Sequence, residues 1–362
     1  MDRDAASTPR ALVIRRGRTA GPAGAPRRRA AGARAPALVA SAAGALVACA
    51  GAPASTLSTA GAPGTAETWA GWLVLGVAAA VVVIVTALVL VAALRRRGEP
   101  ALVPPTGTGL PWVVIGGIVV PAIVLTVIFV ATTLTLAAVS APPRGADTIQ
   151  VLAHRWWWEV QYPGGAPAER VTTANEVHVA AGRPVKLVLS SGDVVHSFWV
   201  PRLAGKTDVI PGQRNVTWIE AKRPGVYYGR CGEYCGAQHA NMQLRLVADA
   251  PADFARWLAA QRQPAAAALS AAADSGRQVF MRVGCANCHT IRGTPARGVL
   301  GPDLTHLMSR GTIAGGTLPN TPGNRAAWVV DAQGIKPGAL MPSMPLPPPE
   351  LRVLLAYLET LR

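Results

Sequence analysis

The sequence predicts a multidomain membrane protein in which a two-helix transmembrane hairpin precedes an all-β domain and a small all-α domain. Three observations lead to this fold class. Two apolar runs, within residues 70–94 and 110–139, are each long enough to cross a bilayer. Residues 145–250 contain short runs of strand-like alternation between turn signals, and residues 274–362 show helical periodicity. A chain of 362 residues has room for about two or three domains.

The charge of the chain is strongly positive and unevenly distributed. There are 35 Lys and Arg residues against 19 Asp and Glu residues, which gives a formal net charge of +16. Residues 1–48 alone hold nine arginines against two aspartates. This basic arm contains no aromatic residue and precedes an export signal, so the charge does not indicate a nucleic-acid-binding protein.

The first 48 residues are predicted to be a lipoprotein-type signal peptide. Residues 35–48 form an apolar run that is too short to span a bilayer but has the length of a signal-peptide core. The run ends at Leu46-Val-Ala-Cys49, which resembles a bacterial lipoprotein box and implies cleavage before Cys49 and lipidation of its thiol. The alternative is an ordinary signal peptide with an incidental cysteine. Residues 49–69, rich in small residues, are expected to form a flexible tether.

The two apolar runs predict transmembrane helices joined by a cytoplasmic loop. Trp72 to Leu94 contains a single polar residue, Thr86, and is followed by Arg95-Arg96-Arg97. Basic residues favour the cytoplasmic side of a membrane, so the loop at residues 95–109 is predicted to be cytoplasmic. The second run, within residues 110–139, contains Pro121, which is expected to kink it. Everything after residue 139 is then predicted to be extracytoplasmic.

A cluster of soft metal ligands lies within the predicted β domain. Cys231, Cys235, His239 and Met242 place two thiols, an imidazole and a thioether within twelve residues. Such donors select copper over hard cations such as magnesium. His196 can supply a second imidazole from an upstream segment. The alternatives are a zinc knuckle or a disulfide with Met242 as an ordinary core residue, although a zinc site has no use for a thioether.

These segments closely resemble subunit II of haem-copper cytochrome c oxidases. The resemblance rests on residues 195–201, 205–212 and 231–242 and implies a Greek-key cupredoxin domain carrying the binuclear CuA centre. It implies that Cys231 and Cys235 bridge two coppers, that His196 and His239 each cap one copper, that Met242 is an axial ligand, and that Glu233 contributes its backbone carbonyl. The Glu233 carboxylate is implied to bind magnesium at the contact with subunit I.

The aromatic segment at residues 153–163 resembles the part of the same family that lies beneath the copper centre. In that family the first tryptophan of the segment, here Trp156, receives electrons from the donor. The alternative is that Trp156, Trp157 and Trp158 only pack in the core or an interface. Three further runs in this domain, at residues 175–180, 185–189 and 215–220, are strand-like. Residues 251–273 are expected to be a linker with a short helix at 252–261.

The last predicted domain contains Cys285-Ala-Asn-Cys288-His289, the attachment pattern of a c-type haem. In this pattern the thiols of Cys285 and Cys288 add to the haem vinyl groups, and His289 reaches the iron. An amphipathic segment at 274–280 precedes the pattern, and a leucine-striped helix at 349–362 ends the chain. This order resembles a class I cytochrome c, in particular the one fused to subunit II in caa3-type oxidases. The resemblance implies Met341 as the second axial ligand, with Met344 as the alternative.

Both predicted sites have filled ligand sets, and the chain shows no nucleophile–base pair or phosphate loop. Filled sites carry electrons instead of binding substrate. The resemblance implies an electron-transfer subunit of a caa3-like oxidase, which relays electrons from its own haem c to CuA and on to the haem of subunit I, where oxygen is reduced. Implied partners are subunits I and III and an upstream cytochrome c or cytochrome bc complex, at the bacterial plasma membrane. The alternatives are the CuA subunit of a haem-copper nitric oxide reductase and a membrane-tethered electron carrier.

Overall fold

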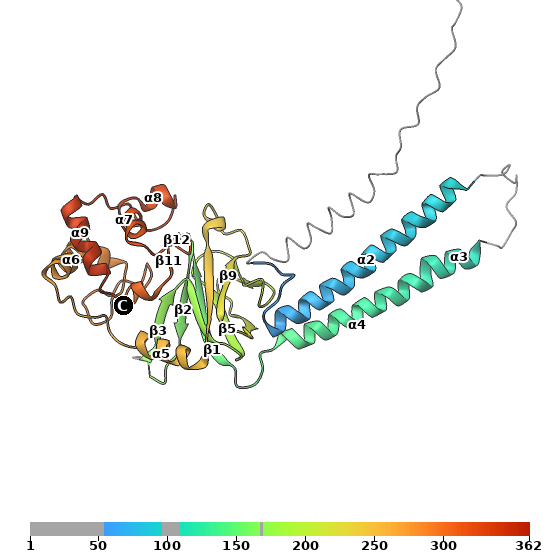
Figure 1. The fold of residues 1–362 in the computed structure, drawn as a ribbon, viewed down its shortest axis with the longest axis horizontal. Helices are drawn as coiled ribbons and strands as arrows, with labels where there is room; N and C mark the ends of the chain where they lie inside the picture. Colours follow the sequence, from blue (N-terminus) through green and yellow to red (C-terminus); the bar gives the residue numbers. More distant parts are fainter. Residues whose placement is uncertain (1–53, 96–108, 167–168) are drawn as a thin grey trace, which may run out of the picture. The chain divides into compact units, whose positions relative to one another are not determined.

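The computed structural model describes residues 54–95, 109–166 and 169–362 (Figure 1). The predicted signal peptide, Cys49 and most of the predicted cytoplasmic loop lie outside the described residues. Within the described ranges, the structure confirms the predicted combination of an apolar two-helix hairpin, an all-β domain and a mainly helical C-terminal domain.

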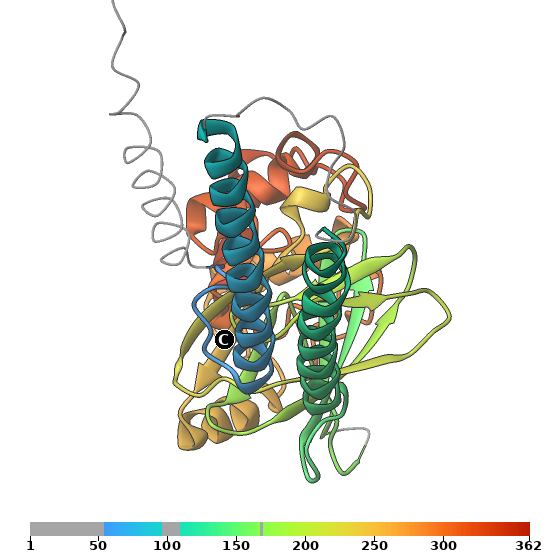
Figure 2. The same cartoon turned by 90° about the vertical axis from the view of Figure 1, so that its right-hand side faces the viewer.

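Two long apolar helices form the hairpin and neighbour each other in Figure 2. The first is α2 (Ala62–Leu94), and the second runs through α3 (Leu110–Val114), η1 (Ile115–Val119) and α4 (Val120–Ser140). Both are long and apolar enough to cross a membrane, and their most apolar windows are not buried within the chain. The segment η1 is a π-helical turn that ends just before Pro121, whose ring nitrogen has no hydrogen to donate to the preceding turn.

The predicted flexible tether is wrong for the residues that the structure describes. Helix α2 begins at Ala62, well before residue 70, and the segment before it packs on the β domain. The Ala60 N–H donates to the carbonyl of Arg202 at 2.8 Å, and the Gly64 N–H donates to that of Leu203 at 2.8 Å. The small residues that suggested flexibility permit this close contact, because a Cβ at Gly64 would lie 3.0 Å from the Leu203 backbone.

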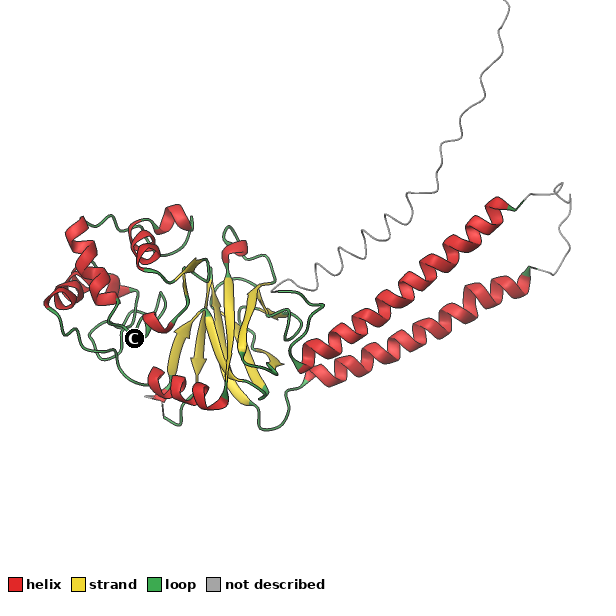
Figure 3. Cartoon of the chain, viewed as in Figure 1, coloured by secondary structure: helices red, strands yellow, loops and turns green. Residues whose placement is uncertain are grey.

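The β domain is a cupredoxin-like sandwich of two five-stranded sheets (Figure 3). One sheet has the order β3-β2-β1-β5-β8 and the other β4-β10-β9-β6-β7. The strands are β1 (Asp147–His154), β2 (Trp157–Tyr162), β3 (Val171–Ala174), β4 (Glu176–Ala180), β5 (Val185–Ser191), β6 (His196–Trp199), β7 (Thr207–Val209), β8 (Asn215–Ile219), β9 (Gly225–Cys231) and β10 (Gln243–Asp249). The three predicted strand runs are confirmed as β4, β5 and β8.

Alternation along the strands fills the space between the sheets. In β5, Val185, Leu187 and Leu189 are buried, while Lys186 and Val188 are only partly covered. Successive side chains of a strand point to opposite faces, so one face of β5 supplies the core. The core residues of both sheets form a single cluster that also contains Cys231, Cys235 and Met242. The metal-ligand residues are therefore continuous with the hydrophobic core.

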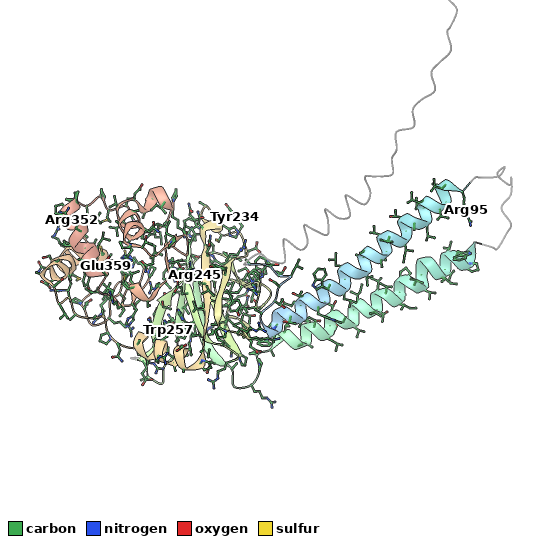
Figure 4. All side chains as sticks on the ribbon, in the orientation of Figure 1. Arg95, Tyr234, Arg245, Trp257, Arg352 and Glu359 are labelled. Atoms are coloured by element: carbon green, nitrogen blue, oxygen red, sulfur yellow. The ribbon has the colours of Figure 1, made fainter. Side chains whose placement is uncertain are left out.

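The helix predicted near residues 252–261 is present as α5 (Pro251–Gln261), but it packs on the β domain. Phe254, Trp257 and Leu258 lie against the core of that domain. The indole of Trp257, which Figure 4 labels on α5, stacks on the ring of His178 with centroids 4.0 Å apart. Only residues 262–270 then connect α5 to the next helix.

The C-terminal domain packs four helices around a small core. They are α6 (Ala271–Arg282), α7 (Pro322–Val330), α8 (Ala332–Ile335) and α9 (Pro348–Leu358), with 3-10 turns η4 (Cys285–Asn287) and η5 (Leu307–Ser309) and a hairpin of β11 (Thr312–Ile313) and β12 (Leu318–Pro319). The last helix ends at Leu358, before the predicted end at residue 362. Leu354 and Leu358 of the predicted stripe are buried. Gly276 on α6 has no room for a side chain, because a Cβ would clash with the Val353 carbonyl of α9.

We predict that Gly276→Ala destabilises the C-terminal domain by about 1–3 kcal/mol, because the added methyl group forces α6 and α9 apart. Gly323→Ala is the matched control, since Gly323 is also helical but has nothing near its Cβ position. The control should be neutral or stabilising by up to about 1 kcal/mol through helix propensity. Thermal unfolding of both variants in detergent measures the difference, and equal effects would show that the helix crossing is not tight.

Candidate metal centres

The predicted copper-ligand residues are held at the ends of neighbouring strands. His196 is the first residue of β6, Cys231 is the last residue of β9, and Met242 immediately precedes β10. The Cys231 N–H donates to the Met242 carbonyl at 2.9 Å, which closes the intervening loop on itself. The Gly232 N–H donates to the Ser197 carbonyl at 2.8 Å, which ties the loop to β6. Within the loop, η3 (His239–Asn241) is a single 3-10 turn.

All six predicted copper-ligand residues, five from the loop and its ends together with His196, lie close to one another. The donor atoms of His196, Cys231 and Cys235 lie within 4.8 Å of one another, and all three residues are buried. Cys231 Sγ lies 3.9 Å from His196 Nδ1 and 3.1 Å from the Glu233 carbonyl oxygen. Cys235 Sγ lies 3.6 Å from His239 Nδ1 and 3.8 Å from Met242 Sδ. The sequence therefore located the whole cluster, including the distant His196.

The chemistry of the cluster suits a soft metal. Both thiols are free, and Met242 is completely buried with its sulfur directed at Cys235. A hydrogen bond from Cys235 and further contacts with His196 and the loop backbone lower the pKa of Cys231 to about 3. The same contact raises the pKa of Cys235, so one thiolate is favoured at Cys231, and a thiolate is the form that binds metal. Two thiols, two imidazoles and a thioether are a copper-type donor set.

A second site lies in the C-terminal domain, in a cavity of about 390 Å³. Cys285, Cys288 and His289 line this cavity, and so do both Met341 and Met344. His289 Nδ1 lies 2.7 Å from the Pro302 carbonyl, so Nδ1 carries the hydrogen and Nε2 is left free as a ligand. Burial lowers the pKa of His289, which favours the neutral, metal-binding form of the ring.

The rest of the cavity lining also fits a haem. Apolar side chains, including Leu304, Ile313 and Trp328, form much of the wall, and the guanidinium-bearing Arg310 and Arg325 also line it. A haem is a large apolar ring with two carboxylates, so an apolar cavity with two buried arginines matches its chemistry.

Comparisons with known proteins identify the families of both domains. A family model described as the periplasmic domain of cytochrome c oxidase subunit II matches residues 165–249, and a cytochrome c model matches residues 273–362. Subunit 2 of the cytochrome c oxidase of Alkalihalophilus pseudofirmus is 34% identical over 281 residues, which are 76% of this chain and 80% of the relative. The chain belongs to the cytochrome c oxidase subunit II family. The two matching families imply copper and haem c as its cofactors.

A second relative has the same name. Cytochrome c oxidase subunit 2 of Bacillus sp. strain PS3 is 30% identical over 266 residues, 68% of this chain and 73% of the relative. Among solved structures, the periplasmic domain of oxidase subunit II (CoxB) of Bradyrhizobium japonicum is 27% identical, with a TM-score of 0.31. That similarity covers 33% of this chain and 96% of the CoxB domain. With two helices that could span a membrane, this subunit II is a membrane-anchored protein with an extracytoplasmic domain.

Trp156 contacts both metal sites of this subunit II. Its indole Nε1–H donates to the Cys235 carbonyl at 3.0 Å. The same side chain lines the cavity that contains Cys285, Cys288 and His289 (the haem-type cavity), together with Trp157 of the adjoining strand. Trp158, the third residue of the tryptophan run, is instead fully buried in the β-domain core, in edge contact with His196 and Phe198. The three tryptophans therefore have different surroundings, and Trp156 is the one placed between the sites.

Asp193 adjoins the predicted copper site, and the sequence analysis did not assign it. Its Oδ1 lies 2.8 Å from His196 Nε2, on the opposite side of the ring from Cys231. Burial raises the pKa of Asp193, but its hydrogen bonds, first with His196 and then with backbone amides, bring the pKa below its ordinary value. A carboxylate on the remote nitrogen fixes the tautomer of a ligating histidine. The Asp-x-x-His spacing is a signal that could have indicated this role.

The Glu233 carboxylate, implied to bind magnesium, is engaged by a lysine in the structure. Its Oε2 lies 2.9 Å from Lys206 Nζ, and both side chains are exposed. The neighbouring Tyr234 is 75% exposed on the loop (Figure 4). This side of the copper loop is thus open, whereas the sulfur ligands face the core.

We predict that Asp193→Ala lowers the affinity for copper by about 10–100-fold, because His196 loses the partner that orients it. Asp193→Asn retains an acceptor oxygen and should lose less. Asp253→Ala, which removes an exposed carboxylate on α5, is the control. Competition with a chelator of known copper affinity measures all three. Equal affinities for Asp193→Ala and the control would mean that Asp193 does not support the site.

Proposed function

We propose that this chain is subunit II of a caa3-like cytochrome c oxidase, passing electrons from its own haem c to a binuclear CuA centre and on to the haem of subunit I. The observation that carries the proposal is the presence in one chain of both donor sets, with Trp156 in contact with each. When bound, copper and haem c supply reversible one-electron redox chemistry. The chain supplies their ligands, their orientation and their separation from water.

For the copper site, we assign the ligands to the residues that converge on the loop. The thiolates of Cys231 and Cys235, the imidazoles of His196 and His239, the thioether of Met242 and the backbone carbonyl of Glu233 would together hold two coppers. The burial of Cys231, Cys235, His196 and Met242 supports this assignment, because it keeps most of the donor atoms away from water. A filled, water-excluding site is suited to electron transfer. The zinc alternative has no role for the buried thioether.

For the haem site, we assign Cys285 and Cys288 to the covalent attachment, His289 to one axial position and Met341 to the other. The hydrogen bond of His289 to Pro302 supports the first axial assignment. Gln333 Nε2 donates to the Met341 carbonyl at 2.6 Å, which restrains the Met341 backbone. A thioether axial ligand raises the reduction potential of the haem into the range of electron carriers.

Trp156 is the residue that we assign to electron passage between the two sites. Its buried indole bonds to the backbone of Cys235 on one side and lines the haem-type cavity on the other. We further infer that both metal domains lie outside the bacterial plasma membrane, that subunits I and III are the membrane partners, and that an upstream cytochrome c or bc complex is the donor. Binding of magnesium by Glu233 would require the carboxylate to leave Lys206.

The test of the proposed function is metal content with EPR spectroscopy on the full chain, purified in detergent and matured with haem and copper. We expect two coppers in one shared mixed-valence signal and one covalent haem per chain. Cys235→Ser should remove the copper signal and leave the haem. A single copper, or zinc in place of the pair, would contradict the proposal and leave a tethered cytochrome with a different metal site.

We predict that Met341→Leu abolishes the low-spin methionine-ligated haem spectrum and leaves copper binding intact. Leucine has a similar volume but no sulfur, so the cavity is retained while the ligand is lost. Met344→Leu is the matched control, because Met344 lines the same cavity. If the spectrum survives in Met341→Leu and disappears in Met344→Leu, the axial ligand is Met344.

A further inference from the structure

A lysine of the cytochrome c domain is buried against the copper domain. Lys336 is 2% exposed. Its ammonium donates three hydrogen bonds to carbonyls, to Trp156 at 2.8 Å, Asn241 at 2.8 Å and Ala314 at 2.9 Å. The first two acceptors belong to the copper domain, one in the Trp156 segment and one in the metal-ligand loop. A lysine ammonium has three donors, so this environment satisfies all of them.

Neither electron transfer nor the folding of one domain accounts for this lysine. Burying an ammonium is costly unless its hydrogen bonds are fully made. Burial lowers the pKa of Lys336 to about 8, so the side chain is still mostly charged near neutral pH. Two of its three acceptors, the carbonyls of Trp156 and Asn241, are within reach only when the two domains are in contact. The burial therefore favours one particular docked arrangement, in which the carbonyls of Trp156 and Asn241 converge.

The backbone around Lys336 is shaped for the same contact. Gly315, between β11 and β12, has φ +69°, and a Cβ there would clash with Lys336 Nζ and the Trp156 carbonyl. The Gly315 carbonyl in turn accepts from the Gln243 N–H at 2.9 Å, at the start of β10. A glycine at this position permits both the left-handed backbone and the close approach of the two domains.

A buried carboxylate of the copper domain makes the reciprocal contact. Glu176 on β4 is 4% exposed. Its Oε1 accepts from the Gly311 N–H at 2.8 Å and from the N–H and hydroxyl of Thr312 at 3.1 and 3.3 Å. These donors lie in the cytochrome c domain, at the start of β11. Each domain thus places one buried charge on backbone groups of the other.

We propose that Lys336 and Glu176 are positioning residues that hold the cytochrome c domain in one fixed orientation on the copper domain. The proposal deepens the proposed function, since it explains how Trp156 is kept in contact with both metal sites. A fixed contact keeps the donor–acceptor geometry constant, whereas a domain swinging on residues 262–270 would have to search for it. The fused cytochrome then acts as a built-in relay instead of a tethered shuttle.

The first test needs no metal. Hydrogen exchange of the metal-free full chain in detergent reports the amides of Thr312 and Gln243, which are protected only across the domain contact. We expect Lys336→Met to accelerate exchange at both by about tenfold or more, because it removes three buried hydrogen bonds. Amides within β5 should not change. Lys222→Met, which alters an exposed lysine, is the control. Unchanged protection of Thr312 and Gln243 in Lys336→Met would overturn the proposal.

If Lys336→Met does not fold, Glu176→Gln tests the same domain contact from the copper domain. The glutamine has nearly the same volume and retains an acceptor oxygen, but it lacks the charge. We expect a smaller acceleration of the Thr312 amide, and no change would count against Glu176 as a positioning residue.

The second test uses the loaded chain. After flash photoreduction of the haem, we expect the wild-type rate of electron transfer to copper to be independent of solvent viscosity. In Lys336→Met the rate should fall by about tenfold or more and become viscosity-dependent, because docking then precedes transfer. The haem spectrum and copper EPR signal should not change. If copper does not bind as proposed, the hydrogen-exchange test still decides whether Lys336 is a positioning residue. If copper binds, an unchanged and viscosity-independent rate in Lys336→Met would exclude that role.

Discussion

The ends of three adjacent strands hold His196, Cys231 and Met242, three of the predicted copper ligands, and the arrangement of the site depends on this constraint. Strands β10, β9 and β6 are neighbours in one sheet, and Phe198 of β6 pairs with Cys231 of β9. The sheet therefore sets the separation of the His196 imidazole from the Cys231 thiol before any metal binds. Ligands supported by a packed core and a second layer of hydrogen bonds, such as that of Asp193, keep their geometry when the metal changes charge.

The same sheet also connects the copper site to the haem site. Its first strand, β4, provides Glu176, and the start of β10 provides the Gln243 amide; both bond to the β11–β12 region of the cytochrome c domain. Gln238 of the metal-ligand loop donates to the Pro337 carbonyl at 2.9 Å. The loop that carries the copper ligands is thus also a docking surface for the domain that carries the haem ligands. Trp156 occupies the centre of this arrangement.

Unlike the β domain, which buries its apolar side chains, the membrane hairpin exposes them. Its helices expose large apolar side chains along their length, for example Leu88 and Phe129 at 64% and 70%. Exposing two such large apolar surfaces to water is unfavourable, so lipid or other membrane helices must cover them. Hydrogen bonds join this hairpin to the β domain: the N–H groups of Ala60 and Gly64 donate to residues 202 and 203, and the Trp218 indole donates to the Val139 carbonyl at 2.9 Å.

The sequence by itself determined the features that depend on neighbours along the chain. The Cys-x3-Cys and Cys-x2-Cys-His spacings, the alternation in β5 and the long apolar runs are local patterns with few physical interpretations, and the resemblance of the His196 segment located the distant imidazole. The tertiary structure decided the packing of residues 54–61 and α5 on the β domain and the contacts of Trp156, Glu176 and Lys336 across the domain boundary. Periodicity shows that a face is buried but not what buries it. Lys336 and Glu176 bond mainly to backbone groups, which nearly every residue carries, so no sequence pattern marks their partners.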